Sequence, residues 1–165
     1  MPLVKNGAIA ADPFTAIADD AALADGPVLV SADRLLSGGA DLLGRNGEIG
    51  VAWPNDRDVT LLQPFLPRLS LVALTFPKFR DGRAYSQARL LRERFGYKGE
   101  LRAVGNVLRD QTLLMVRAGF DAFGFEKAAD AEAFSKALAT YSVFYQPTGD
   151  GRATARDLRR AGTAG

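Results

Sequence analysis

The chain contains no cysteine and no histidine among its 165 residues. The absence of cysteine excludes disulfides, thiolate nucleophiles, CxxC redox pairs and cysteine-ligated iron–sulfur clusters. The absence of histidine excludes a histidine general base, a catalytic triad built on histidine and a histidine-ligated zinc site. We therefore assign no catalytic residue and no metal ligand from the sequence. Any electron transfer would have to rely on a bound organic cofactor or on a partner protein.

Long apolar runs and common nucleotide-binding motifs are also missing. No stretch of about 18 apolar residues occurs, so no transmembrane segment is predicted. The first residues lack the apolar core of a secretory signal, and a cytoplasmic location is the resulting expectation. Neither a GxGxxG motif nor a P-loop motif is present, so classical NAD and P-loop sites have no support. Flavin stays open, because a flavodoxin-like sheet binds it without such a motif.

The rest of the composition is that of an ordinary globular domain. Hydrophobic residues make up 47% of the chain and charged residues 24%. The net charge of +2 is too mild to indicate nucleic acid, and the basic residues do not alternate with aromatic residues in a known binding module. Positive charge is nevertheless concentrated between Lys78 and Arg109. Such a cluster raises the local concentration of anionic ligands or of an acidic partner.

Apolar runs alternate with amphipathic runs along most of the chain. The apolar runs predict five strands, at 27–30, 48–53, 71–76, 101–104 and 120–125. The amphipathic runs predict helices at 34–43, 83–95 and 107–118, another from 130 onward, and a short helix within 57–66. This order is typical of an α/β fold with a short parallel sheet of about five strands and crossover helices, either flavodoxin-like or half-barrel-like.

Turn and cap residues predict where these elements begin and end. Asn6 and Gly7 between apolar residues predict an N-terminal β-hairpin, because both positions of such a turn need a positive φ. Gly96 and Gly119 are predicted to end helices in the left-handed conformation. Asn106 is predicted to cap the helix that follows it.

The C-terminal part is predicted to be one more helix followed by a tail. Asp130 is expected to cap this helix, with Phe134, Leu138 and Tyr141 on its buried face. We expect residues 1–145 to form a single α/β domain. Residues from 146 to 165 are mostly glycine, threonine, alanine and arginine, and are expected to form a flexible tail.

Two turns that follow predicted strands carry the candidate ligand-binding residues. The carboxyl ends of parallel strands share one edge of a sheet, so the two turns are expected to lie together where α/β folds bind ligands. Arginine side chains and the N–H groups at a helix start suit sulfate, phosphate or carboxylate groups. The predicted ligand-binding residues are Lys78, Arg80, Asp81, Arg83, Asn106, Arg109 and Asp110.

The same residues can also have a purely structural role instead of binding a ligand. In that alternative Asp81 pairs with a neighbouring arginine, Gly82 serves the turn and Asn106 only caps a helix. Tyr85 and Trp53 also lie near predicted strand ends, but both are expected to pack against apolar neighbours.

The segment FPKFRDGR at 76–83 is the most distinctive part of a family resemblance. Together with the surrounding residues 71–125 it resembles a bacterial family known as domain of unknown function 934. The resemblance implies an association with assimilatory sulfate reduction, for which members are often labelled oxidoreductases of sulfite reduction. Thr75 and Asn106 stand where the family pattern has aspartate, and Ala118 where cysteine is common. If those aspartates only cap and orient, Thr75 and Asn106 can replace them; if they transfer protons, this chain lacks them.

The resemblance and the charge pattern together lead to a functional expectation with one alternative. The protein is expected to be an accessory protein or a cofactor-dependent oxidoreductase of sulfate or sulfite reduction that binds an oxyanion or a phosphate-bearing ligand. In the alternative it is a non-catalytic module that docks onto sulfite reductase or a related partner through a helix carrying Arg89, Arg92 and Arg94. The expected partners are an anionic small molecule and a sulfate-assimilation enzyme, without nucleic acid or membrane.

Overall fold

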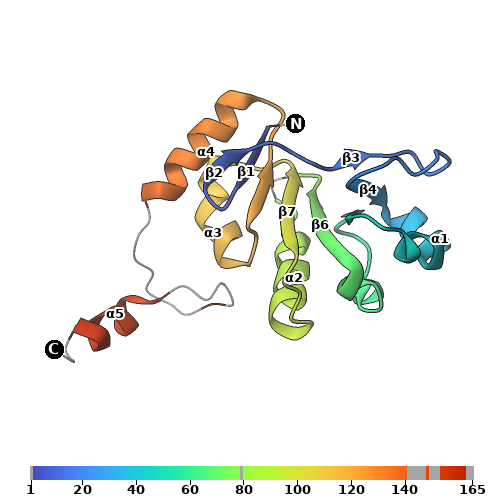
Figure 1. The fold of residues 1–165 in the computed structure, drawn as a ribbon. Coiled ribbons are helices and arrows are strands. Elements are labelled where there is room, and N and C mark those ends of the chain that lie inside the picture. Colours follow the sequence, from blue (N-terminus) through green and yellow to red (C-terminus); the bar gives the residue numbers. More distant parts are fainter. Residues whose placement is uncertain (1, 79, 141–147, 149–152, 163–165) are drawn as a thin grey trace.

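The computed structural model of the protein describes residues 2–78, 80–140, 148 and 153–162. Its main element is an eight-stranded sheet in the order β2-β1-β8-β7-β6-β5-β4-β3 (Figure 1). The strands are β1 (Leu3–Lys5), β2 (Ala8–Ala10), β3 (Thr15–Ala16), β4 (Val28–Ser31), β5 (Ile49–Trp53), β6 (Leu69–Phe76), β7 (Glu100–Gly105) and β8 (Ala122–Gly124). The longer helices are α1 (Ala32–Gly44), α2 (Arg83–Arg89), α3 (Thr112–Arg117), α4 (Ala128–Thr140) and α5 (Ala155–Gly162). Shorter helical turns are η1 (Val59–Leu62), η2 (Leu66–Arg68), η3 (Leu90–Arg94) and η4 (Arg109–Gln111).

Strands β3 to β8 are parallel and follow one another across the sheet in chain order. The order never reverses, so the sheet has no topological switch point and is not flavodoxin-like. The half-barrel-like alternative is confirmed, and the five predicted strands correspond to β4–β8. The prediction of about five strands was too low, because the N-terminal hairpin joins the sheet beside β8 and the two-residue β3 extends the other edge.

The sheet has to curl, because a short segment connects its two edge strands. β2 ends at Ala10 and β3 begins at Thr15, and an extended chain of this length spans at most about 18 Å. Seven strand-to-strand steps separate β2 from β3, which would be about 33 Å in a flat sheet. The sheet therefore curves into a half-barrel, and residues 11–14 run across it from one edge to the other (Figure 1). We call residues 11–14 the crossing segment.

The two faces of the sheet are built from different residues. On the convex face, β6 contributes Val72, Leu74 and Phe76, which pack in the main hydrophobic core under the helices. The intervening residues point to the concave face. Those from β5, β6 and β8 are mostly small and include Gly50, Ala52, Ala73, Ala122 and Gly124. Small side chains leave room on this face for the crossing segment.

Arg102 on β7 is the centre of a buried ion network on the concave face. Its side chain is 0% exposed, its Nε donates to Glu100 at 2.7 Å, and its Nη1 and Nη2 donate to the Asp12 carboxylate at 2.8 and 3.0 Å. Lys5 pairs with Glu100 at 2.8 Å. The Phe14 ring centre lies 5.8 Å from the guanidinium carbon of Arg102. Because an unpaired buried charge is costly, this network holds the crossing segment against the middle of the sheet.

Several predicted helix boundaries are confirmed. Helix α1 begins at Ala32, two residues before its predicted start, and is capped by Ser31, whose hydroxyl accepts the N–H of Arg34 at 3.0 Å. Helix α2 begins at Arg83 as predicted and continues with π-helical hydrogen bonding through η3. Gly96 and Gly119, which follow η3 and α3, have φ values of +65° and +106° and adopt the expected left-handed conformation. The glycines therefore end these helices for the predicted reason.

The predicted caps of the last two helices were wrong. The backbone N–H of Asn106 donates to the carbonyl of Phe76, and residues 109–111 first form the turn η4, so α3 starts only at Thr112. Helix α4 starts at Ala128, which puts Asp130 inside its first turn.

The buried face of α4 is confirmed for Phe134, which is 0% exposed, and Leu138 packs against the core. Tyr141 and most of residues 146–165 lie outside the described residues. Within that C-terminal stretch the structure describes helix α5, whose start is capped by Thr154: its hydroxyl accepts the N–H of Asp157 at 3.3 Å. In the part of the chain that the structure describes, none of the helices is both long and apolar enough to span a membrane.

Candidate functional site

The turns after β6 and β7 lie side by side at the carboxyl edge of the sheet. Phe76 and Gly105, the last residues of the two strands, are register partners. The N–H of Asn106 donates to the Phe76 carbonyl at 2.8 Å. Gly105 has a φ of +88°, and a Cβ at this position would lie 2.5 Å from the same carbonyl oxygen. Only glycine lets the two turns approach this closely.

The turn after β6 contains a two-pronged ion pair. The backbone N–H of Asp81 donates to the carbonyl of Lys78 at 3.0 Å, which closes the turn. Arg83 then donates its Nε to Asp81 Oδ1 at 2.9 Å and its Nη2 to Asp81 Oδ2 at 2.6 Å. The pairing of Asp81 with a neighbouring arginine, expected in the structural alternative, is therefore present. Arg83 first, and the Asn55 side chain second, hold the pKa of the Asp81 carboxyl well below its usual range.

Most of the predicted site residues are open to solvent. The Arg83 side chain is 57% exposed although it is paired. Lys78 and Arg80 are exposed on the same turn, and Asn106 and Asp110 are exposed after β7. The cations of the first turn therefore meet solvent beside the backbone contact between the two turns.

Arg109 lies beside α4. It lines a hollow of about 390 Å³ with residues of that helix, among them Glu132 and Lys136. Among the predicted residues, the structure brings Asp81 and Arg83 into direct contact, and joins Asn106 to the first turn through the backbone.

A third strand exit, residues 54–57 after β5, completes the surroundings of the turn. Gln87 on α2 donates to the carbonyls of Pro54 and Arg57 at 3.3 and 2.8 Å. Asn55 is only 7% exposed, and its side-chain Nδ2 has no hydrogen-bond partner among the described residues although it lies near Asp81. Asp56 is close enough to Arg83 to raise the pKa of its guanidinium, after the larger effects of Asp81. The local sequence does not reveal the approach of this loop to Asp81, because Gln87 on α2 holds the loop in place.

The aromatic residues near these strand ends have packing roles, as expected. Trp53 is 0% exposed and belongs to the main core. The Tyr85 ring packs edge-on against Phe76, with 5.1 Å between ring centres, and also contacts Phe120 at 6.5 Å. Burial raises the pKa of the Tyr85 phenol. These rings pack beneath the charged turn, and the charged side chains of that turn are the groups that can contact a ligand.

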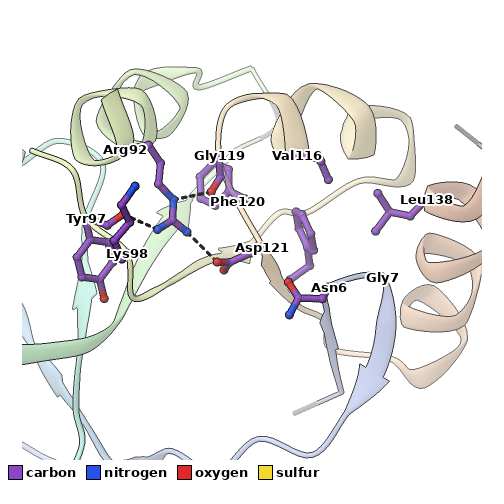
Figure 2. Close-up of a pocket in the computed structure, with 11 residues that line it drawn as sticks. Asn6, Gly7, Arg92, Tyr97, Lys98, Val116, Gly119, Phe120, Asp121 and Leu138 are labelled. Atoms are coloured by element: carbon purple, nitrogen blue, oxygen red, sulfur yellow. Dashed lines mark hydrogen bonds and ion pairs between the residues drawn. The ribbon is translucent and has the colours of Figure 1, made fainter. Parts of the chain in front are cut away.

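A separate cavity of about 320 Å³ lies at the opposite, amino edge of the sheet (Figure 2). Arg92 forms one wall of it, and its guanidinium donates to the carbonyls of Gly119, Tyr97 and Gly99 and to Asp121 Oδ2, at 2.7 to 2.9 Å. The Arg92 side chain is only 13% exposed. Arg92 therefore does not lie on an exposed docking face of this helix, because its guanidinium joins the chain segments before β7 and β8.

The remaining walls of this cavity are mixed. Val116 and Leu138 supply apolar surface, and Asn6 and Lys98 supply polar groups from the hairpin turn and from the segment before β7 (Figure 2). Burial raises the pKa of the Asp121 carboxyl, although Arg92 opposes this effect. Since the guanidinium of Arg92 is engaged with protein acceptors, we interpret this cavity as a consequence of a structural clamp.

The carboxyl-edge site is suited to charge recognition. Asp81 is held in its ionised form, so it is a poor proton donor or acceptor near neutral pH. Lysine and arginine side chains supply hydrogen-bond donors and positive charge in the same turn. Across the described residues, no group of three or more histidine, cysteine, aspartate or glutamate side chains is arranged to hold a metal ion. Lys78, Arg80 and Arg83 thus gather positive charge and hydrogen-bond donors, the groups that suit an anion, on one exposed turn.

Fold and site together define a singly wound α/β half-barrel with a cationic turn at the carboxyl edge of its parallel strands. A protein-family model described as "Bacterial protein of unknown function (DUF934)" matches residues 50–156. This range covers more than half of the chain and includes all three strand exits of the site, and the protein belongs to this family. The resemblance noted over residues 71–125 is thus confirmed. A search of curated proteins found no match.

Proposed function

We propose that this protein binds an oxyanion or a phosphate-bearing ligand at the carboxyl edge of β5–β7. We further propose that it serves assimilatory sulfate or sulfite reduction, as an accessory protein or as a cofactor-dependent oxidoreductase. The ligand class is supported by the geometry of the charged turn. The pathway is supported only by the family resemblance described above. The observation that carries the ligand proposal is the two-pronged contact of Arg83 with the carboxylate of Asp81.

That contact supports the proposal because a carboxylate presents the same pair of oxygens as one face of sulfate or phosphate. Arg83 already holds such a pair at 2.9 and 2.6 Å on an exposed surface. Lys78 and Arg80 add charge on the same turn. Because these groups are exposed, added salt screens them, and the predicted binding weakens as ionic strength rises.

The docking alternative has less structural support. The docking surface is defined by three arginines. One of them, Arg92, is mostly buried and bonded to protein acceptors at the amino edge of the sheet. Arg89 Nε lies 3.5 Å from the carboxylate of Glu93 on the next turn, and this negative charge lowers the net positive charge of the surface. Arg94 remains exposed. Two arginines beside a glutamate make a weaker basic surface than the sequence alone indicated.

A thermal-shift screen at low salt tests the ligand class. Sulfate, sulfite, phosphate, an adenylyl sulfate and flavin mononucleotide are compared with chloride, at concentrations far above the expected Kd. A ligand at about a hundred times its Kd raises the Tm of a domain of this size by several degrees. The double variant Arg80→Ala and Arg83→Ala should lose this shift. Arg89→Ala removes an exposed arginine from the other end of α2 and should keep it.

Two results would contradict the ligand proposal. One is the absence of any shift with all of these ligands, and the other is an equal loss of the shift in Arg89→Ala. The pathway is tested on its own by asking whether sulfite reductase from the same cell co-purifies with the protein, or whether its activity changes when the protein is added. A negative result in both experiments would contradict the proposed pathway but not the proposed ligand class.

A further inference from the structure

The carboxylate of Asp81 occupies the two guanidinium donors of Arg83 that an oxyanion would bind. Both Nε and Nη2 of Arg83 bond to the Asp81 carboxylate, and the backbone N–H of Arg83 also points to Asp81 Oδ1 at 3.3 Å. The carboxylate therefore takes the paired donors and the nearest backbone donor at once. A second anion cannot reach the same face of the guanidinium until Asp81 moves.

We infer that Asp81 is a specificity-determining residue of the proposed site, acting as an internal competitor that an incoming oxyanion must displace from Arg83. This inference rests on the proposed function, and it reverses the role that the sequence suggested for Asp81 as a direct ligand contact. Protonation of Asp81 does not release Arg83 near neutral pH, because the Asp81 carboxyl stays ionised. Displacement by a competing anion is the route that remains.

The surroundings of Asp81 allow such a displacement. Asn55, from the loop after β5, is only 7% exposed, and its side-chain Nδ2 has no hydrogen-bond partner among the described residues, although it lies close enough to lower the pKa of the Asp81 carboxyl. The Nδ2 of Asn55 is therefore a nearby donor from which the Asp81 carboxylate can accept a hydrogen bond once a ligand takes Arg83. The Asp81 side chain is 22% exposed, so it borders solvent and does not have to cross a packed core.

The competitor determines which anions can bind. A carboxylate fixed two residues away has a high effective concentration, of the order of millimolar or more for a short tether. A free monocarboxylate offers the same two oxygens and the same charge, so it gains little by replacing Asp81. Chloride offers a single centre and cannot bridge both donors. A dianion with several oxygens on one atom, such as sulfate or a phosphate monoester, matches the fork and interacts more strongly with Lys78 and Arg80.

The test uses two variants that remove one negative charge each. Asp81→Asn frees Arg83 from its competitor, whereas Asp56→Asn removes a nearby carboxylate that acts on Arg83 only through its charge. Sulfate is titrated into the full-length protein and both variants by calorimetry at low salt. We expect sulfate to bind Asp81→Asn about fivefold more tightly than wild type, the upper end for an exposed ion pair, and Asp56→Asn to change less. Acetate should bind Asp81→Asn measurably better than wild type.

Equal or weaker sulfate binding by Asp81→Asn than by Asp56→Asn would overturn the inference, because Asp81 would then affect sulfate only through its charge. If neither wild type nor Asp81→Asn binds sulfate or phosphate, the proposed function fails together with the inference. Asp81→Ser, which keeps a short turn-forming side chain, carries the same prediction if Asp81→Asn does not fold. The two failures are thus told apart by whether either wild type or Asp81→Asn binds sulfate or phosphate.

Discussion

The guanidinium of Arg102 donates to both carboxylate oxygens of Asp12, at 2.8 and 3.0 Å, although 90 residues separate them in the chain. This contact joins the crossing segment to the centre of the curled sheet. It also explains how a strand in the middle of the half-barrel carries a fully buried charge, since Glu100 and Asp12 together surround it. The shape of the molecule therefore depends on an ion network as well as on its apolar core.

Replacing Arg102 with alanine should destabilise the protein strongly. The change leaves the carboxylates of Glu100 and Asp12 without their main partner, and breaking a buried pair in this way costs about 3–5 kcal/mol. Urea unfolding followed by circular dichroism measures the loss. Lys5→Ala is the control, because Lys5 touches Glu100 but is 45% exposed, and should cost less than about 1 kcal/mol. Similar small losses in both variants would show that the network is not what holds the crossing segment.

Replacing Gly105 with alanine should destabilise the protein and disturb the site. A Cβ at this position would meet the Phe76 carbonyl at 2.5 Å, and the φ of +88° is strained for any other residue. Gly96→Ala is a matched control, because its φ is +65° but no atom lies within 4 Å of the added Cβ. We expect about 1 kcal/mol for Gly96→Ala from backbone strain alone, and clearly more for Gly105→Ala. Equal losses of unfolding free energy would mean that the two turns can separate without cost.

Alkaline pH should weaken the fold through Tyr97. Its hydroxyl is buried and donates to the Leu69 carbonyl at 3.1 Å, and burial raises the pKa of this phenol above its ordinary value. In the unfolded chain the phenol ionises near pH 10. The folded state binds this proton more tightly, so its contribution to stability is complete below about pH 10 and is lost as pH rises toward the higher folded pKa.

Urea unfolding at about pH 7 and at about pH 10.5 checks this sign. The free energy of unfolding should fall between the two values, and Tyr97→Phe should reduce that fall. The variant should also cost about 1 kcal/mol at neutral pH, because it loses the hydrogen bond to Leu69. The buried phenol of Tyr85 has a raised pKa as well, so a smaller slope remains in Tyr97→Phe. An unchanged slope would show that Tyr97 does not control the alkaline limit.

Features of the fold that depend on local geometry were predictable from the sequence. Asn6 and Gly7 have φ values of +52° and +85° and form the turn between β1 and β2. Gly96 ends its helix in the left-handed conformation. Each of these requirements involves only a few neighbouring residues, and few residue types satisfy it. The period of the apolar residues likewise located β4–β8.

Features that depend on distant contacts were not predictable. Glu100 and Arg102 sit in an otherwise apolar strand, and nothing near them in the sequence reveals that Asp12 completes their network. Asn106 has the composition of a helix cap, but the Phe76 carbonyl engages its backbone N–H. The candidate site shows the same division. The sequence predicted that the turns after β6 and β7 share one edge of the sheet, whereas the pairing of Asp81 with Arg83 remained one of two alternatives.

The most direct test of the proposed site is to locate sulfate binding by NMR. Amide shifts of the ¹⁵N-labelled protein are followed during a sulfate titration at low salt, with sodium chloride at matched ionic strength as control. We predict that sulfate-specific shifts cluster at Lys78, Asp81 and Arg83 and extend to Asn106 through its bond to Phe76. Shifts confined to the amino-edge cavity around Asn6 and Lys98, or no shifts beyond those of chloride, would contradict the account.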